Sequence, residues 1–580
     1  MKLIYTLIGM FFFLMPGLLF ANGDKKAGAT GEMNSLTVRP LTNDADDNLN
    51  PFIVADGNGQ AIAVWDQQKT ATGFDLAAQL MEANANIAWD PAGVNVSNDA
   101  ANQQSPVAVG DGAGGMISAF ADDRSGGWQV YAMRMDASGA ALWTANGVLV
   151  ATTALTGPDV PIGIASDGAG GAIIVWELEF STTDHDVYAQ RIDASGNQLW
   201  GTEGVVVTSA SDDERFPKVI GDGVGGAIVC WEDSRNDTTD VYANRLDPNG
   251  ALMWTLADTA VSPAGGMIPQ LRPSMALDAN GNIVFSWSQE ISATDWNIES
   301  VGRALDGTKV WGVFTDAALA FDDNIQLLQV ADGTIFVWEA NKVGGDKRIY
   351  AQKASLDGQF PLWGSTPVLV SDTTLGDPFA KPQIVSDGAD GVIITYEREF
   401  NATDRDVWAQ HINSSGVPQW STSGGSRGIF ISQGFHDEPN PTIASDGAGG
   451  AYIAWEDNRS GNWDIYGDRV DATGTLVGIE DDALSALPTG YQLQQNYPNP
   501  FNPTTEIRFA TPRSAEVTLT VHNMLGQTVR TLVSGTVEAG NHTVSWNGKN
   551  NLGKAVTSGV YLYRLTAGSE VSAKKMMLIR

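Results

Sequence analysis

The stretch FPKVIGDGVGGAIVCWEDSRNDTTDVYANRLD, residues 216–247, contains the unit from which most of the chain is built. A short apolar run leads to a Gly-rich turn at Asp222, a second apolar run ends at Trp231, and a third run follows a polar loop. Short apolar runs separated by turn residues, with no helical periodicity between them, predict β-strands joined by hairpins. We expect a fourth strand around Ala260 and Val261.

This unit returns along the chain, and the aspartate of its Gly-rich turn marks each copy. The turn aspartates are Asp56, Asp111, Asp167, Asp222, Asp278, Asp332, Asp387 and Asp446. The first and last are 390 residues apart over seven intervals, so the period is about 56 residues. Four short strands per unit, the second of them apolar on both faces, predict the blades of a β-propeller.

Two series of aromatic residues accompany the units. One closes the second strand of every unit, and we expect it to form the core: Trp65, Phe120, Trp176, Trp231, Trp287, Trp338, Tyr396 and Trp455. The other follows the third strand in seven units and is absent from the eighth: Trp89, Trp143, Trp200, Trp254, Trp311, Trp363 and Trp420. Large buried aromatic rings can stabilise a chain whose single cysteine, Cys230, excludes internal disulfides.

The eighth unit ends before a fourth strand, whereas a strand-like segment, LTVRPLT at residues 36–42, precedes the first unit. We therefore predict an all-β fold in which residues 35–477 form an eight-bladed β-propeller closed by this N-terminal strand. An open β-solenoid is the alternative. The units also resemble the WEDxRxGxxDIYAQR repeats of secreted bacterial proteins, a resemblance that implies no particular activity.

The N-terminal residues 1–21, MKLIYTLIGMFFFLMPGLLFA, are typical of a secretory signal peptide, with a membrane anchor as the alternative. We expect a protein that is secreted or held on the outer cell surface. Charge separates two further regions: the chain carries −34, but residues 491–580 carry +5, which leaves −39 for the rest. Such an acidic body disfavours nucleic acid and anionic membranes as its partners, and residues 478–490 are predicted to be a linker.

Residues 491–580 alternate apolar positions with Gly and Asn turns, which predicts a small immunoglobulin-like β-sandwich. The segments PNPFNP (498–503), NMLGQ (523–527), Trp546 and SGVYLYRL (558–565), with a basic end, occur in the order of the type IX secretion sorting domain, which this module resembles. The resemblance implies the type IX secretion machinery as a partner. The same fold occurs in flagellar hook-assembly proteins, so an immunoglobulin-like domain without a sorting role is the alternative. The candidate sorting residues are Pro498, Asn499, Pro500, Phe501, Gly526, Gly559, Lys574, Lys575 and Arg580.

The five histidines are scattered, without an HExxH motif or a close pair, and no nucleophile elbow is present, which disfavours a zinc or triad enzyme. The polar loops after the second strands combine carboxylates and arginines, groups that bind sugars or calcium. We expect the neighbouring Trp128, Trp296 and Trp463 to be exposed there. Alternatively, a feature repeated in many blades is a turn or ion-pair device of the unit. The candidate ligand-binding or cation-binding residues are Asp122, Asp123, Arg124, Glu232, Asp233, Arg235, Glu456, Asp457 and Arg459.

The leading hypothesis from the sequence is a monomeric, noncatalytic binding protein whose propeller presents an acidic face to a glycan, a peptide or a cation. Calcium (Ca2+) is the only cofactor that the residues suggest. The alternatives are an extracellular carbohydrate-active enzyme, a glycosidase or lyase on a propeller scaffold, and a structural component of the envelope. Propellers carry several such chemistries, but the sequence singles out no pair of carboxylates.

Overall fold

The computed structural model describes residues 39–579 apart from 43, 71–72, 159–161, 182, 210–211, 237, 255–258, 263–267, 293–294, 317–319, 342–346, 372–380, 402–403, 422–426, 433–435, 478–489, 513–514, 538–539 and 568–569. The expected signal peptide, nearly all of the expected linker, and Arg580 lie outside the described residues. The described elements are all β-strands, in agreement with the predicted all-β class. No helix of the described residues has the length and apolar character needed to cross a membrane.

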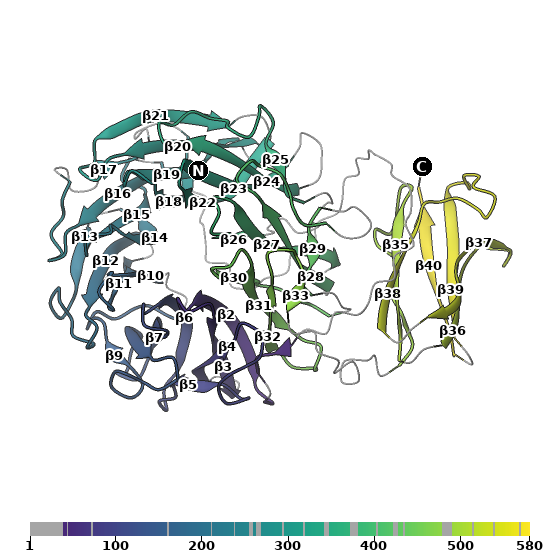
Figure 1. Cartoon of the computed structure of the whole chain (residues 1–580), viewed down its shortest axis with the longest axis horizontal. Coiled ribbons are helices and arrows are strands. Elements are labelled where there is room, and N and C mark those ends of the chain that lie inside the picture. Colours follow the sequence, from purple (N-terminus) through teal and green to yellow (C-terminus); the bar gives the residue numbers. More distant parts are fainter. Residues whose placement is uncertain are drawn as a thin grey trace.

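Eight antiparallel sheets, here called blades 1 to 8, account for the described part of residues 39–477, and Figure 1 shows how they follow one another. Blade 1 contains β2 (Asp47–Ala55), β3 (Ala61–Thr70), β4 (Gly73–Met81) and β5 (Val94–Ser97), and blade 2 contains β6 (Gln103–Gly110), β7 (Met116–Asp122), β8 (Gln129–Met135) and β9 (Val148–Leu149). Blade 3 contains β10 (Ile162–Ser166), β11 (Ala172–Ser181), β12 (Asp184–Ile192) and β13 (Val205–Thr208), and blade 4 contains β14 (Glu214–Gly221), β15 (Ala227–Asp233), β16 (Asp240–Leu246) and β17 (Thr259–Ala260).

The second half of this region repeats the same order. Blade 5 contains β18 (Gln270–Leu277), β19 (Ile283–Ser292), β20 (Asp295–Arg303) and β21 (Lys309–Asp316), and blade 6 contains β22 (Ala320–Val330), β23 (Gly333–Asn341), β24 (Lys347–Ser355) and β25 (Val368–Leu369). Blade 7 contains β26 (Gln383–Ser386), β27 (Val392–Asn401), β28 (Asp404–Ile412) and β29 (Ile429–Phe430). Blade 8 contains β30 (Thr442–Ser445), β31 (Ala451–Asp457), β32 (Asp464–Val470), β33 (Leu476–Val477) and the N-terminal β1 (Arg39–Pro40).

The aromatic residue that closes the second strand is buried in all eight blades, with at most 1 % of its surface exposed. In blade 4, for example, Trp231 on β15 packs beside Tyr242 on β16. The second strands are covered on both faces by neighbouring blades, which explains why their sequences are continuously apolar rather than alternating. The prediction that this series forms the core is confirmed.

The second tryptophan series connects each blade to the next one. Trp200, which follows the third strand of blade 3, donates its indole N–H to the backbone oxygen of Pro248 in blade 4 at 3.1 Å. The same ring lies against Gly250, where an added Cβ would be only 2.9 Å from Cγ of Trp200. Gly250 has a φ of +85°, so the turn needs a glycine for its backbone conformation as well as for space.

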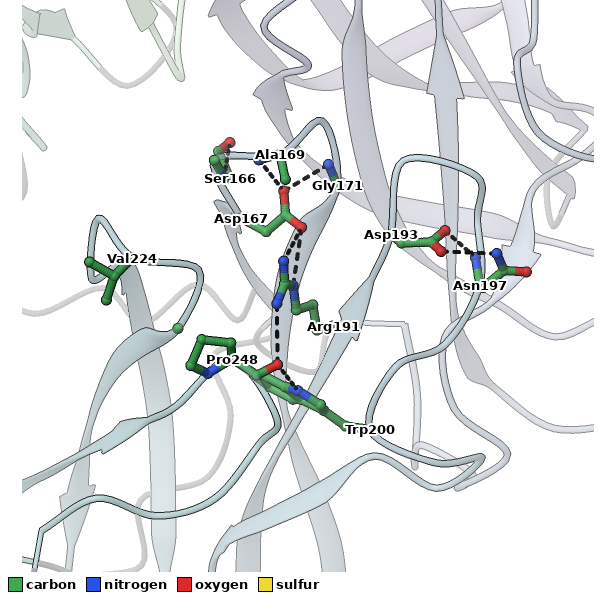
Figure 2. A network of polar contacts seen from close by, with 12 residues as sticks. Ser166, Asp167, Ala169, Gly171, Arg191, Asp193, Asn197, Trp200, Val224 and Pro248 are labelled. Atoms are coloured by element: carbon green, nitrogen blue, oxygen red, sulfur yellow. Dashed lines mark hydrogen bonds and ion pairs between the residues drawn. The ribbon is translucent and has the colours of Figure 1, made fainter.

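Figure 2 shows a second contact between the same two blades, formed by the turn aspartate. One oxygen of Asp167 accepts the backbone N–H groups of Ala169 and Gly171, each at 2.8 Å, and therefore holds the hairpin turn. The other oxygen accepts Nε and Nη2 of Arg191 at 3.1 and 2.9 Å, while Nη1 of Arg191 donates to the oxygen of Pro248 at 3.2 Å. The repeated aspartate is thus both a turn residue and part of the interblade contact.

At the junction of blades 8 and 1, where the tryptophan of the second series is missing, the N-terminal strand β1 pairs with the third strand of blade 8 as the fourth strand does in other blades. Pro40 on β1 pairs with Tyr466 on β32, and Leu41, fully buried, donates its backbone N–H to the oxygen of Ile465 at 2.7 Å. The turn position that is glycine in the other junctions is here Ala85, with a φ of +60°. A Cβ fits at Ala85 because no indole ring covers this turn.

The C-terminal module consists of two sheets around one core (Figure 1). Trp546, Tyr563 and Phe501 are buried in this core. The module also contacts blade 7, because Nη2 of Arg508 lies 2.9 Å from Oδ2 of the buried Asp406. One sheet contains β34 (Gln492–Leu493), β35 (Thr505–Thr511) and β38 (Gly540–Trp546), and the other contains β37 (Thr528–Val537), β36 (Ala515–His522), β39 (Gly559–Ala567) and β40 (Glu570–Leu578).

Candidate functional site

The aspartate and arginine residues predicted to bind a ligand form ion pairs within their own hairpins. In blade 4, Nη2 of Arg235 lies 2.5 Å from Oδ2 of Asp233, which is fully buried. The guanidinium stacks 4.5 Å from the ring centre of Tyr242 and donates to Oγ1 of Thr208 in blade 3 at 3.1 Å. The same arrangement joins Asp122 and Arg124 to Tyr131 and Ser97, and Asp457 and Arg459 to Tyr466 and Ser432.

The predicted glutamates also contact the following blade. Glu232 accepts the backbone N–H of Arg272 at 2.6 Å, and Glu456 accepts that of Asn50 at 2.8 Å. Arg272 and Asn50 have positive φ angles and sit where the first strand of the following blade changes register. Burial raises the pKa of Glu232 to about 7. Asp123 accepts both the backbone and the side-chain N–H of Asn102 at 2.8 Å.

These nine residues lie in blades 2, 4 and 8, and the contacts of each group stay within its own blade and the blade beside it. Within the residues that the structure describes, no group of three or more His, Cys, Asp and Glu side chains is placed to hold a metal ion. The expectation that Trp128, Trp296 and Trp463 are exposed is wrong: Trp296 is buried, with the guanidinium of Arg272 over its ring, and the other two are half-buried.

The junction between blades 3 and 4 has a different arrangement. His185 on β12 is 2 % exposed, and its Nδ1 lies 2.5 Å from Oδ1 of Asp213. Its Nε2 lies 3.6 Å from Oε1 of Glu177 and 3.9 Å from Oε2 of Glu179. Nη2 of Arg215 is 3.3 Å from the same Nε2. A titratable ring therefore lies among three carboxylates and one arginine.

These contacts indicate the hydrogen-bonding role of each ring nitrogen. With the proton on Nδ1, His185 donates to Asp213, and Nε2 accepts the N–H of Arg215. Arg215 also contacts Glu177, with Nε 3.3 Å from Oε1. The other oxygen of Glu177 accepts the backbone N–H of Phe216 at 3.1 Å, the same role that the buried glutamates have at other junctions.

The equivalent position in blade 7 is occupied by arginine. His185 pairs with Glu179 across its hairpin, as Arg405 pairs with Glu399. Arg405 donates Nε and Nη2 to the two oxygens of Asp437, each at 2.6 Å. The two units have similar sequences here, ELEFSTTDHDVYAQ at 177–190 and EREFNATDRDVWAQ at 397–410. The histidine of the first stands where the second has arginine. A comparison of these two units could have identified His185 from the sequence. A search for pairs of histidines could not have identified it.

The surface of this junction is polar with exposed aromatic residues. The side chains of Asp213 and Glu179 are 27 % and 28 % exposed, so solvent reaches both carboxylates. Phe180 and Phe216 are 59 % and 45 % exposed. Nearby, burial and the charge of Asp184 raise the pKa of Asp186 to about 6, while His185 opposes this shift. A carboxyl group with a raised pKa, that of Asp186, is therefore next to His185 in the sequence. We call His185, Glu177, Glu179, Asp213 and Arg215 the junction cluster.

The candidate sorting residues are placed in the C-terminal module, apart from Arg580. Phe501 belongs to the core, and the side-chain oxygen of Asn499 accepts the backbone N–H of Met577 at 2.9 Å. Gly526, with a φ of +79°, closes the 523–527 turn. The remaining residues occupy the edge of the same module: Pro498 and Pro500 precede Phe501, Gly559 begins β39, and Lys574 and Lys575 lie on β40.

Comparison with known proteins links the module to one family. Residues 497–570 match the FlgD Ig-like domain family, so the C-terminal module is similar to that family over this segment. The predicted immunoglobulin-like sandwich is thus supported, and this match corresponds to the alternative that the sequence left open. Among curated proteins, the comparison finds no match to the chain.

Solved structures similar to this chain include several proteins described as carbohydrate-active. An ulvan lyase is 12 % identical, over 76 % of this chain and 96 % of its own, with a TM-score of 0.39. An endo-arabinase from Bacteroides thetaiotaomicron is 15 % identical, over 48 % of this chain and 98 % of its own, with a TM-score of 0.28. A protein of unknown function from Dyadobacter fermentans is 12 % identical, over 64 % and 98 %, with a TM-score of 0.36. At these TM-scores the likeness carries no argument about the activity of this chain.

Proposed function

We propose that this protein is an extracellular carbohydrate-active enzyme that hydrolyses neutral polysaccharide at the junction cluster. The supporting observation is the replacement of the arginine of blade 7 by His185, which places a titratable ring between Asp213 and Glu179. Both carboxylates are partly exposed, and Phe180 and Phe216 provide exposed apolar rings of the kind that stack on sugars.

Hydrolysis of a glycosidic bond needs two carboxyl groups, one to protonate the leaving oxygen and one to activate water or attack the sugar. Glu179 and Asp213 are assigned these two roles. His185 is a positioning residue, because it is buried, its Nδ1 contacts Asp213, and its Nε2 lies 3.9 Å from Oε2 of Glu179. Its ring fixes the orientation of Asp213 and keeps the proton of Nδ1 on the side of that carboxylate.

The charge of the junction cluster limits the substrate. Glu177, Glu179 and Asp213 outnumber Arg215, and the body of the chain is strongly acidic. An anionic polysaccharide such as a uronate polymer would be repelled by this surface. A neutral polysaccharide is therefore the proposed substrate class.

A second candidate function is sugar binding without catalysis, the leading hypothesis from the sequence. It is favoured by the similarity of the two junctions. At the junction of blades 7 and 8, Arg405 contacts Asp437 and Glu397. At the junction of blades 3 and 4, His185 contacts Asp213 and Glu177 in a similar way. If the junction cluster only joins blades, a sugar could still bind to the exposed phenylalanines without being cleaved.

One experiment separates these functions. The chain is incubated with a panel of neutral and anionic polysaccharides, and new reducing ends are measured together with binding. If the protein is an enzyme, it should release reducing ends from a neutral polysaccharide of the panel. The variants Asp213→Asn and Glu179→Gln should then release none. Asp437→Asn is the matched control, because it removes the same contact at the junction of blades 7 and 8 and should retain activity. Binding without reducing ends would support the second candidate, and equal activity in all variants would exclude the junction cluster.

The proposal includes the shape and delivery of the enzyme. The eight blades form a closed ring, supported by the pairing of β1 with β32. Cysteines introduced as Pro40→Cys and Tyr466→Cys, which are direct cross-strand partners, should form a disulfide if the ring is closed in this way. Cys230 is buried and should not compete.

The C-terminal module acts as a type IX sorting domain and brings a monomeric enzyme to the cell surface or the medium. The ordered motifs from PNPFNP to the basic end support this role. Expression of the chain in a host with this secretion system should give extracellular protein, and deletion of residues 491–580 should keep it inside the cell. Export without the module would exclude the sorting role.

A further inference from the structure

Two turns of the C-terminal module expose large apolar side chains. Met524, Leu525 and Leu552 are 65 %, 84 % and 81 % exposed. The two turns are built alike: the N–H of Gly526 donates to the oxygen of Asn523, and that of Gly553 to the oxygen of Asn550, each at 2.9 Å. Nothing in this backbone geometry requires apolar residues at the exposed turn positions, where polar side chains are usual.

Hydrogen bonds hold the second turn beside the strand that leaves the first. The backbone N–H of Asn551 donates to the oxygen of Val529 at 3.0 Å, and the N–H of Thr531 donates to the side-chain oxygen of Asn551 at 3.0 Å. Nη1 of Arg530 donates to the oxygen of Asn550 at 3.2 Å. Met524, Leu525 and Leu552 therefore belong to one end of the module, and we call these three residues the tip surface.

Positive charge surrounds the tip surface. Lys549 and Lys554 are exposed at the two ends of the second turn, and Arg530 lies beside it. Lys575 is also at this end, because it pairs with Leu562, and Leu562 pairs with His522 just before the first turn.

The acids of the module are placed differently. Glu516 and Glu570 lie at the opposite ends of their strands, next to Val517 and Ala567, roughly 20 Å away at the rise of an extended strand. Of the acids described in the module, only Glu506, which pairs with Tyr497, is near the tip end. The module is thus polarised: Lys549, Lys554, Arg530 and Lys575 lie around the exposed apolar residues, and Glu516 and Glu570 lie at the other end.

We propose that the tip surface inserts into an anionic lipid surface, with Lys549, Lys554 and Arg530 at the level of the lipid headgroups. Apolar side chains that penetrate a bilayer surface and basic residues around them are the two features that bind proteins to anionic membranes. The charge distribution of the chain agrees with this occupant, since the module carries +5 and the rest −39. Repulsion of the acidic body from the lipid would then leave the module as the part that touches the membrane.

The test uses vesicles of phosphatidylglycerol and phosphatidylcholine, and vesicles of phosphatidylcholine alone, with the chain starting at residue 22. This start is needed because the apolar segment 1–21 would itself bind lipid. Cosedimentation should show binding to the anionic vesicles that weakens as salt is raised. The double variant Leu525→Ser, Leu552→Ser should bind about tenfold or more weakly, since two inserted side chains are lost.

Two further variants make the outcome specific. Val571→Ser is the matched control, because Val571 is 50 % exposed but lies at the opposite end of the module, and it should bind like the unaltered chain. Lys549→Gln with Lys554→Gln should weaken binding and reduce its dependence on salt. Absence of binding to the anionic vesicles would overturn the proposal, as would unchanged binding of the double leucine variant or an equal loss in Val571→Ser. Capture of a protein partner by the tip surface, with no binding to vesicles, would also overturn it.

Discussion

Substitution of Gly250 by alanine should destabilise the protein through Trp200 of the preceding blade. At a φ of +85° the new Cβ would lie 2.9 Å from Cγ of Trp200 and 3.0 Å from Cδ1 and Cδ2, well inside the 3.5–4.0 Å optimum for two carbon atoms. An L-residue in the left-handed region costs about 1–2 kcal/mol, and overpacking of a rigid contact adds about 1–3 kcal/mol. The free energy of unfolding should fall by the sum of the two.

The control is Gly223→Ala, in the turn between β14 and β15. Gly223 has a φ of +78°, but nothing lies within 4 Å of an added Cβ, so this variant carries only the backbone cost. Gly250→Ala should therefore lose about 1–3 kcal/mol more than Gly223→Ala in guanidinium unfolding followed by far-ultraviolet circular dichroism. In a Trp200→Ala background, the two alanine variants should become equal. Equal losses in the unaltered background would refute the interblade role assigned to Trp200.

Three other variants and treatments test the remaining contacts. Asp167→Ala leaves Arg191 and two backbone N–H groups without their acceptor, so it should lower the unfolding free energy by about 3 kcal/mol. The half-buried Asp193 accepts only from Ser195 and Asn197 of its own turn, so Asp193→Ala should cost less than about 1 kcal/mol in the same denaturant unfolding. Burial raises the pKa of Asp468 from 3.8 to about 8, so the folded chain holds an extra proton between these values and loses stability as the pH rises through that window. Asp468→Asn should remove this loss and melt higher than the unaltered chain at pH 9; an unchanged pH dependence of the melting temperature would contradict it. A chelator should leave the melting temperature unchanged, because the predicted carboxylates are already bound to arginine and backbone groups, and a lower melting temperature would indicate a calcium site.

The repeat unit made the strands predictable to a large extent. The fourth strand expected near Ala260 is present as β17, and the described part of the strand expected at residues 36–42, Arg39–Pro40, pairs with blade 8. Both follow from the pattern, because short apolar runs between glycine turns are typical of β-strands. The partner of each second-series tryptophan could not be predicted. Trp200 and Gly250 are 50 positions apart, and only the packing of consecutive blades brings them together.

The candidate site was harder to predict from the sequence than the strands were. Asp233 and Arg235 have the residue types of a binding site, but their partners, Tyr242 and Thr208, come from another strand and another blade, so only the structure reveals the interblade contact. His185 does not belong to a recognisable sequence motif, because its neighbours in space are distant in the chain. Glu177 comes from β11 and Asp213 from the start of blade 4. Comparison of one repeat with another is the procedure that finds such a residue.

The most direct test of the account is the pH dependence of polysaccharide hydrolysis in His185→Arg. Arginine is the residue that joins the equivalent position of blade 7 to Asp437, so this variant should keep the contact with Asp213. Its melting temperature is measured alongside, because the new arginine would face Arg215, which lies 3.3 Å from Nε2 of His185. Because a guanidinium replaces the imidazole beside Asp213, release of reducing ends from the neutral substrate should be lost or should show a different pH profile. An unchanged rate and pH profile would contradict the account and would leave His185 with a structural role alone.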